Sequence, residues 1–529
     1  MIFINAKIVI IVLTHKICPN IFAVVIQNRQ KMKKWNTTLR YAGFSLLGVA
    51  LLMFLSAFIA FRNEMDDSFD PLVFSGMVSL LSGFFAIITT EPQENMSVEE
   101  GFCIVTGCWI TACSFGALPF LICGGEFTLV NAFFESVSGF TTTGASILND
   151  IEALPKGLQF WRIATAWMGG IGIVTLVSLV ISGQHDRHSV LASAELSDLA
   201  KSYYGGRKKH FVYRMIVVYL MITSVSAFAL RLTRMPWFDA ATLAMSACST
   251  CGFCAKNLSV GFYDSWVVEA ILCVAMLLGA TNFSLMFSTV WPDKLNRKNL
   301  FNSQIVRWFL SLVAIAMLIV TANLYFSGYC ASFPKALRLA AFQVCSLSTT
   351  TGFATADTNL WPSGSIGILI LCSLVCGCSG STSGGIKMDR FVIAIKSLKG
   401  LVRSLIGAKN VSNVKIEGEV KTEEKLSSVL AFMGTYMLVI AAGTIIFAIS
   451  MDFKTSLTAS IACMGSVGPG FGEVGSMGNY AGLMGFQKVA AMFIMLLGRV
   501  EIFPMLVAFR SIFRRRHLHN SSFLPFFAD

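Results

Sequence analysis

The sequence predicts an all-α polytopic membrane protein in which two amino-terminal helices precede four similar units gathered around a central axis. Three observations support this fold class. Hydrophobic residues make up 55% of the chain and charged residues only 13%, whereas a soluble protein carries about 25% charged residues. The apolar residues form runs long enough to cross a bilayer, which takes about 20 residues in a helix. One pattern of long run, short run and glycine-bearing segment recurs four times.

The amino-terminal region divides into two parts. Residues 1–31 are apolar but interrupted by Lys7, His15 and Lys16, so they fit neither a cleavable signal peptide nor a clean spanning helix. We interpret this stretch as an amino-terminal extension and assign it no function. Residues 32–98 begin with a basic flank and contain two charge-free runs, and they form the predicted two-helix domain.

The chain contains ten predicted crossings. Eight runs are free of charged residues, namely 41–61, 71–90, 101–125, 163–183, 215–230, 270–292, 308–327 and 426–451. Two further runs are imperfect. One begins near residue 363 and is interrupted by glycines and serines, and the other, at 479–509, contains Lys488, Arg499 and Glu501.

Four shorter amphipathic segments lie between the long runs, at 128–139, 236–248, 334–347 and 453–464. At about 12 residues each they are too short to span, so we expect re-entrant half-helices. Each is followed by a polar loop with a glycine, and these glycines are Gly144, Gly252, Gly352 and Gly468, separated by 108, 100 and 116 residues. The repeat divides the chain into units 99–184, 207–292, 303–405 and 424–512, followed by a tail at 513–529.

Lysine and arginine predict that the amino terminus is cytoplasmic. Basic residues cluster before the first run, at 201–214, at 294–307, in 387–425 and after the last run. With ten crossings all these segments lie in the cytoplasm, as the positive-inside bias requires, and the four short segments enter from outside. The net charge of +12 is therefore topological and predicts no nucleic-acid partner.

The four glycine loops predict a cation site. An irregular backbone at membrane depth is tolerated only where it lines water or is packed in protein. Loops from four similar units share one environment if they meet at an axis, where their carbonyl oxygens can replace the water around a cation. Glycine permits the required backbone angles, and the carboxyl ends of the half-helices add partial negative charge. A passive packing turn is the alternative for any single loop.

Motifs in these loops resemble the pore loops of the TrkH/KtrB/HKT superfamily of potassium transporters. The motifs are TTTGAS at 141–146, STCGF at 249–253, TTTGFATAD at 349–357 and SVGPGFGE at 466–473. GCSGSTSGGIK at 377–387 resembles the intramembrane gating loop of the superfamily, and LLGRVEIFP at 496–504 resembles its last helix. The likeness covers residues 40–512, and the two additional amino-terminal helices indicate the TrkH branch.

The resemblance implies four pseudo-fourfold M1–pore helix–M2 repeats around a central, potassium-selective ion pore. The implied filter residues are Thr142, Thr143, Gly144, Thr250, Cys251, Gly252, Thr350, Thr351, Gly352, Val467 and Gly468. Their backbone would hold K⁺, and no other metal is expected. Cys251 departs from the pattern, because relatives often carry glycine there.

The break at 376–386 is the predicted gate. Each glycine costs a helix about 1 kcal/mol relative to alanine, so we expect the chain to leave the helix here. A passive kink is the alternative, and the resemblance favours a loop that obstructs the cavity below the filter and moves aside. The implied gate residues are Gly377, Gly380, Ser381, Thr382, Ser383, Gly384, Gly385, Lys387 and Arg499.

Lone charges near the loops also have predicted roles. An intramembrane arginine usually faces the bundle interior, so we expect Arg499 to contact loop carbonyls or to add a positive barrier; a position at the cytoplasmic edge is the alternative. Glu501 lies on a different helix face and is a poor partner for it. Glu135 is expected to brace the first loop. Asp357 and Glu473 are candidate cation attractors or braces, with solvation at the outer rim as the alternative.

The predicted function is potassium uptake by the ion-conducting subunit of a Trk-type system in the bacterial plasma membrane. The chain has no nucleotide-binding glycine motif, so no cofactor is expected in it. The resemblance implies a homodimer, surrounded by lipid and regulated by a cytoplasmic TrkA-like nucleotide-binding subunit. A carrier for a small solute or a symporter coupled to sodium or protons is the alternative. An enzyme is disfavoured, because no catalytic groups converge in the apolar runs.

Overall fold

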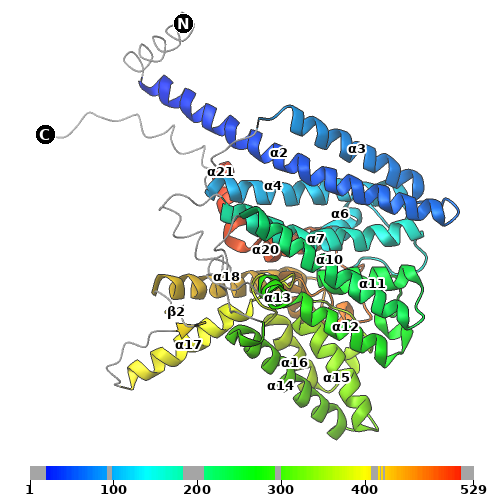
Figure 1. The fold of residues 1–529 in the computed structure, drawn as a ribbon. Coiled ribbons are helices and arrows are strands. Elements are labelled where there is room, and N and C mark those ends of the chain that lie inside the picture. Colours follow the sequence, from blue (N-terminus) through cyan, green and yellow to red (C-terminus); the bar gives the residue numbers. More distant parts are fainter. Residues whose placement is uncertain are drawn as a thin grey trace, which may run out of the picture.

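The computed structural model describes residues 19–91, 98–182, 208–291, 300–406, 415–417, 419–420 and 423–513. Regular structure in these ranges is almost entirely helical, and many of the long helices run side by side (Figure 1). The predicted all-α class is therefore confirmed. The exception is a small antiparallel pair, β1 (Lys415–Ile416) and β2 (Glu419–Val420), which the sequence did not predict. Residues 201–207, 294–299 and 407–414 of the expected basic loops, and the tail from residue 514, lie outside the described residues.

Six helical segments are long and apolar enough to cross a membrane, and each matches a predicted run. They are Asn36–Arg62 in α2 (Pro19–Arg62), α3 (Phe69–Ile88), Glu99–Cys123 across α4 (Val98–Gly116) and α5 (Leu118–Cys123), Met215–Leu232 in α10 (Lys208–Leu232), α14 (Gln304–Phe326) and Lys425–Phe447 in α18 (Glu423–Phe447). Residues 163–182 of the predicted run at 163–183 belong to α7 (Lys156–Ser182), a helix of 27 residues.

Two predicted spans are bent, and the sequence analysis did not anticipate either bend. The run at 270–292 turns by 104° between α12 (Trp266–Gly279) and α13 (Phe283–Val290). The side chain of Asn282 caps α13, and this turn is tied to a distant loop, because the N–H of Phe283 donates to the oxygen of Gly380 at 3.2 Å.

The second bend lies between α20 (Gly485–Val500) and α21 (Ile502–Phe513), where the chain turns by 107°. Glu501 forms this junction with a φ of 69°, in the left-handed region that side chains disfavour. Its carboxylate pairs with Arg390 at 2.9 Å, so an ion pair from another helix accompanies the bend.

The four predicted half-helices are present, with bounds close to those expected. They are α6 (Leu129–Phe140), α11 (Trp237–Ser249), α15 (Phe333–Ser348) and α19 (Phe453–Gly465). Two begin at side-chain caps, Thr128 on α6 and Asp452 on α19. The hydrogen bond from the side chain of Thr455 helps to hold the pKa of Asp452 below its ordinary value.

The packing of the short helices closes on itself. Each contacts the long helix before it and the helix that follows its own loop, as α6 does with α4 and α7. Each also contacts the helix that follows the preceding loop: α11 packs on α7, α15 on α12, α19 on α16 (Ser363–Leu374), and α6 on α20. Four helix–loop units therefore form a cycle in which the last unit meets the first.

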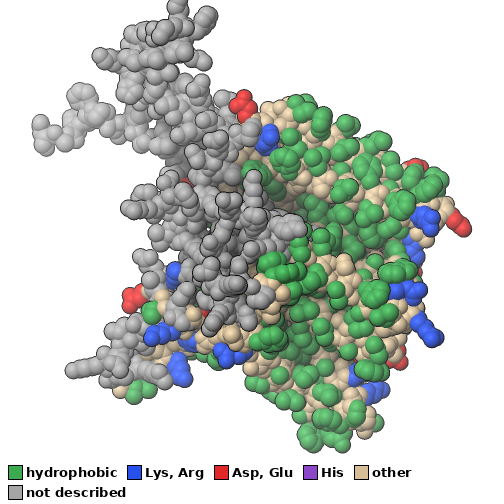
Figure 2. Space-filling view, in the orientation of Figure 1, with side chains coloured by type: hydrophobic (Ala, Val, Ile, Leu, Met, Phe, Trp, Pro, Cys, Tyr) green, Lys and Arg blue, Asp and Glu red, His purple; other side chains and the backbone are tan. Residues whose placement is uncertain are grey.

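The outside of the protein is more apolar than the lining of this cycle. In Figure 2 hydrophobic side chains cover the middle of the face, and charged side chains gather toward its two ends. Large apolar side chains such as Leu51 and Phe85 are 70% and 69% exposed. In contrast, the hydroxyl residues that end the short helices, such as Ser138 and Thr349, are fully buried. This distribution is that of a multi-pass membrane protein.

Candidate functional site

The four glycine loops share one backbone conformation. The residue two positions before each glycine is left-handed, with φ of 52° at Thr142, 55° at Thr250, 59° at Thr350 and 53° at Ser466. The glycines follow with φ of 78° at Gly144, 81° at Gly252, 83° at Gly352 and 92° at Gly468. Non-glycine residues in this region are strained, and such strain is concentrated at functional sites. We call the segments 142–144, 250–252, 350–352 and 466–468 the glycine ring.

Each glycine marks the place where one loop touches the next. A Cβ atom on Gly144 would overlap the backbone oxygen of Cys251. A Cβ atom on Gly252 would likewise overlap the backbone oxygen of Thr351, one on Gly352 that of Val467, and one on Gly468 that of Thr143. Each partner directly precedes the glycine of its own loop, so the contacts run once around the ring and close. Side chains are excluded at these four positions, and backbone oxygens lie at every contact.

In the first and third loops, the hydroxyl at the end of the short helix pairs with the hydroxyl of the threonine directly before the glycine. Thr141 Oγ1 lies 2.8 Å from Thr143 Oγ1, and Thr349 Oγ1 lies 2.8 Å from Thr351 Oγ1. The thiol of Cys251 contributes no such support, because its side chain packs in an apolar cluster with Ile163, Ala166 and Phe253. The backbone oxygen of Cys251 and its Sγ both lie close to the position that a Cβ atom on Gly144 would take.

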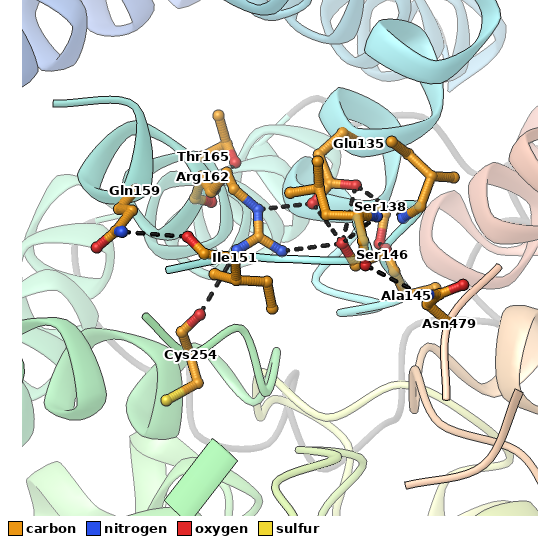
Figure 3. A network of polar contacts seen from close by, with 12 residues as sticks. Glu135, Ser138, Ala145, Ser146, Ile151, Gln159, Arg162, Thr165, Cys254 and Asn479 are labelled. Atoms are coloured by element: carbon orange, nitrogen blue, oxygen red, sulfur yellow. Dashed lines mark hydrogen bonds and ion pairs between the residues drawn. The ribbon is translucent and has the colours of Figure 1, made fainter. Parts of the chain in front are cut away.

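A buried ion pair behind the first loop was missed by sequence reasoning. Glu135 on α6 is 0% exposed and Arg162 on α7 is 1% exposed, and Arg162 Nε lies 2.6 Å from Glu135 Oε1 (Figure 3). The carboxylate also accepts hydrogen bonds from the hydroxyl of Ser146 at 3.1 Å and the N–H of Ile147 at 3.2 Å. Glu135 thus braces the first loop, as its position in the half-helix predicted.

The signal that could have found Arg162 is the acidic partner. A carboxylate in an apolar half-helix requires a cation or several donors, and Arg162 stands directly before the run counted as charge-free. The two other acidic candidates lie differently. Asp357 caps the short 3₁₀ turn Thr358–Leu360, and Glu473 is exposed.

The predicted break in the run that begins near residue 363 is confirmed. Helix α16 ends at Leu374, and regular helix resumes only at α17 (Met388–Leu405). The ends of the intervening segment, which we call the 375–387 loop, pair through a bridge between Val375 and Ile386. Backbone hydrogen bonds then attach the loop to the bend after α12, from Cys378 to Ala280 at 2.8 Å and from Thr382 to Gly279 at 3.2 Å.

The 375–387 loop lies directly against the glycine ring. The N–H of Gly384 donates to Thr350 Oγ1 at 2.9 Å, and Ser383 Oγ lies 3.1 Å from the same hydroxyl. Thr250 Oγ1 lies 3.4 Å from Thr382 Oγ1. The corresponding hydroxyls of Thr142 and Ser466 have no hydrogen-bond partner among the described residues. The loop therefore engages the second and third members of the ring through hydrogen bonds.

Two cations hold the loop in place. Arg499 is 4% exposed and donates from Nη1 to the oxygen of Thr382 at 2.6 Å and from Nη2 to the oxygen of Gly169 at 3.4 Å. Lys387 donates to the oxygen of Ser383. Arg499 therefore contacts a carbonyl of the loop, which is one of the two roles expected for it. As expected, Glu501 is not its partner, because that carboxylate pairs with Arg390.

The remaining predicted gate residues lie in the same loop. Gly380 and Gly385 have φ of 78° and 65°, and Ser381 Oγ donates to the oxygen of Cys378 at 2.6 Å. Gly377 accepts a backbone hydrogen bond from Met388. Across the described part of the chain, no group of three or more His, Cys, Asp or Glu residues is arranged to hold a metal ion.

Comparison with known proteins identifies the family. The model of a family described as TrkH, cation transport protein, matches residues 70–518. The chain belongs to the TrkH family. Its members are transporters, and the predicted membership is confirmed.

Named relatives extend over most of the chain. The Trk system potassium uptake protein TrkH of Salmonella typhimurium is 32% identical over 425 residues, which are 80% of this chain and 87% of that protein. The Trk system potassium uptake protein TrkI of Halomonas elongata is 30% identical over 497 residues, 92% of this chain and 98% of that protein. The crystal structure of the potassium transporter TrkH from Vibrio parahaemolyticus superposes with a TM-score of 0.80 at 28% identity, covering 89% of this chain and 98% of that one.

Proposed function

We propose that this chain is the ion-conducting subunit of a potassium-uptake system of the Trk type. The observation that carries the proposal is the closed cycle of glycine–oxygen contacts between the four loops. A dehydrated cation needs oxygen ligands from several directions, and backbone carbonyls around one axis supply them. The relatives named above are described as potassium uptake proteins, which supports K⁺ as the transported ion.

The proposed architecture is four M1–pore helix–M2 repeats around one pore, preceded by two amino-terminal helices. The cyclic packing of the short helices supports it, as does the equal backbone conformation of the four loops. The carboxyl ends of the four short helices face the ring and add partial negative charge there. In this account, the backbone oxygens of the glycine ring are the ligands of K⁺.

The proposed gate is the 375–387 loop. Its hydrogen bonds to Thr350 and its contact with Thr250 support a position across the conduction path on the side where the short helices end. Deleting residues 378–383 should raise ion flux and loosen its dependence on a regulatory partner. Equal or lower flux in a deletion variant that reaches the membrane at the wild-type amount would count against this gate.

The proposed setting is the bacterial plasma membrane, with a cytoplasmic amino terminus and the chain present as a homodimer. A cytoplasmic TrkA-like subunit would bind nucleotide and control opening. The distribution of lysine and arginine between the apolar runs supports the orientation, and the naming of the relatives as parts of a Trk system supports an assembly of several components.

Rubidium uptake in a bacterial strain that lacks its own potassium transport tests the proposal. Expression of the chain should give saturable uptake of radioactive rubidium that excess potassium suppresses and excess amino acids or sugars leave unchanged. Uptake suppressed by an organic solute instead would indicate a solute carrier. Loss of uptake after collapse of the sodium or proton gradient at constant membrane potential would indicate a coupled symporter.

A further inference from the structure

The four joints of the glycine ring are held by different groups. At the second joint, the N–H of Gly261 donates to the oxygen of Ala354 at 3.0 Å. At the third, the side chain of Asn359 bonds both the N–H and the oxygen of Gly472, at 2.7 and 3.0 Å. At the fourth, the N–H of Tyr480 donates to the oxygen of Ser146 at 2.8 Å. These hydrogen bonds all join neutral groups.

The first joint has a neutral hydrogen bond from the N–H of Ile151 to Asn257 Oδ1 at 2.7 Å and, in addition, a buried cation. Arg162 Nη2 donates to Ser146 Oγ at 3.2 Å, and Nη1 donates to the oxygen of Cys254 at 3.5 Å. The guanidinium also lies over the ring of Phe253, 4.2 Å from its centroid. Ser146 and Cys254 both stand two positions after the glycine of their loop, so one side chain contacts equivalent points of the first and second loops (Figure 3).

Charge is balanced at this joint. Glu135 is the ionic partner of Arg162 and also bonds the first loop through Ser146 and Ile147. The planar guanidinium suits such a bridge, because its donors diverge in a fixed fork that a lysine ammonium cannot reproduce. A buried pair of this kind is costly when one partner is removed, since the other charge is left uncompensated in a medium of low dielectric constant.

We propose that Arg162 and Glu135 are positioning residues that fix the first filter loop against the second and thereby set the preference for K⁺ over Na⁺. The inference rests on the proposed function. Discrimination requires oxygens that stay at the distance suited to K⁺ and do not close around the smaller Na⁺. A joint held by one side chain with contacts to both loops keeps that distance, and a loosened joint lets the oxygens approach Na⁺.

The opposite charges of the two side chains allow a positioning role to be distinguished from a purely structural one, by the KM for rubidium in single variants. Arg162→Gln leaves a carboxylate behind the filter, which attracts cations, so the KM for rubidium should fall. Glu135→Gln leaves a guanidinium there, which repels cations, so the KM should rise. A purely structural role would move the KM of both variants in the same direction. The double variant, Arg162→Gln with Glu135→Gln, restores neutrality, and its KM should lie between those of the single variants.

A more exposed ion pair between the second and third units supplies a control. Arg338 on α15 pairs with Glu269 on α12 at 2.8 Å and with Asp264 at 2.8 Å. This pair also joins two units of the cycle, but the hydrogen bonds of Arg338 go to Glu269 and Asp264, which lie outside the glycine ring and the two positions that follow each glycine. Arg338→Gln should therefore change the amount of protein in the membrane without changing ion preference.

Rubidium uptake and its inhibition by sodium, measured in the transport-deficient strain and normalised to the amount of protein in the membrane, test the inference. We expect Arg162→Gln to reduce the rubidium-to-sodium preference roughly tenfold, a change of one RT ln 10 in discrimination. Arg162→Lys keeps the charge but loses the fork, so it should retain the wild-type KM and still lose preference. After normalisation to protein amount, Arg338→Gln should have the wild-type KM for rubidium and the wild-type preference for rubidium over sodium.

The outcomes distinguish the two proposals. Wild-type protein without rubidium uptake would overturn the proposed function and this inference with it. Wild-type uptake combined with an unchanged preference in Arg162→Gln would overturn this inference alone. If Arg162→Gln does not reach the membrane, Arg162→Lys decides by the same ratio, and an unchanged ratio there overturns the inference. KM values that shift in the same direction for Arg162→Gln and Glu135→Gln would also reject it.

Discussion

Arg499 donates a hydrogen bond of 2.6 Å to the backbone oxygen of Thr382, a residue 117 positions earlier in the chain. The arginine belongs to the last turn of α20, and Thr382 lies at the centre of the 375–387 loop. The Nε of Arg499 has no hydrogen-bond partner among the described atoms. The guanidinium is thus buried against carbonyl oxygens, and its hydrogen bond to the loop is shorter than its hydrogen bond to Gly169.

The first prediction follows from that contact. A hydrogen bond to a charged group contributes about 1.5–3 kcal/mol, so Arg499→Gln should shift the loop away from the ring and raise rubidium flux about tenfold. Initial uptake rates in the transport-deficient strain measure this. Arg510→Gln, which changes an exposed arginine on α21, is the control and should leave the rate unchanged. A lower rate for Arg499→Gln at equal protein amount would contradict the idea that Arg499 holds the 375–387 loop against the ring.

The hydroxyls of the glycine ring offer a matched pair. Thr350 Oγ1 accepts from Gly384 and contacts Ser383, whereas Thr142 Oγ1 has no partner in the described part of the chain. Thr350→Val should weaken the loop contact by about 1 kcal/mol and raise flux several-fold. Thr142→Val removes an equal group and should leave the gate unaffected. Equal effects of the two changes on the flux rate would show that the hydroxyls do not hold the loop.

The third prediction concerns a close approach of two backbones. A Cβ atom on Gly384 would overlap the oxygen of Gly465 at the end of α19. Gly384→Ala should therefore displace the loop from the fourth unit and increase flux that does not depend on a partner. Gly367→Ala, in α16 with no atom within 4 Å of the added carbon, should be neutral or stabilise the helix by about 0.5–1 kcal/mol. Uptake rate and thermal unfolding of both purified variants test this, and an unaltered rate in Gly384→Ala would argue against a tight fit.

Much of the fold could be predicted from sequence, for a physical reason. The bilayer imposes length and composition on spanning helices, so α3, α14 and α18 follow directly from charge-free runs. The half-helices were predicted with bounds close to the observed ones, because glycine and threonine end them sharply. The two bends were missed. Gly279 and the cap Asn282 are local signals of the turn at Ala280, but the distant loop that bonds to it lies about 100 residues later in the chain and could not be linked to it from sequence.

The site was predicted only in part. The glycines of the ring could be identified because a positive φ requires a recognisable residue type, and their recurrence singled them out. Arg162 could not be identified in this way, because its role depends on three segments that only the folded chain brings together: α6, α7 and the second loop. Periodicity within one helix carries no information about such a bridge.

The most direct test of the account is the ratio of rubidium to sodium uptake by wild-type protein and by Gly352→Ser in the transport-deficient strain. Gly352 has a φ of 83°, and a Cβ atom there would overlap the oxygen of Val467, so the serine must displace an oxygen of the ring. We predict that Gly352→Ser lowers the ratio by roughly tenfold or more while the protein still reaches the membrane. Potassium-dependent growth and an unchanged ratio in both proteins would contradict the claim that this ring selects the ion.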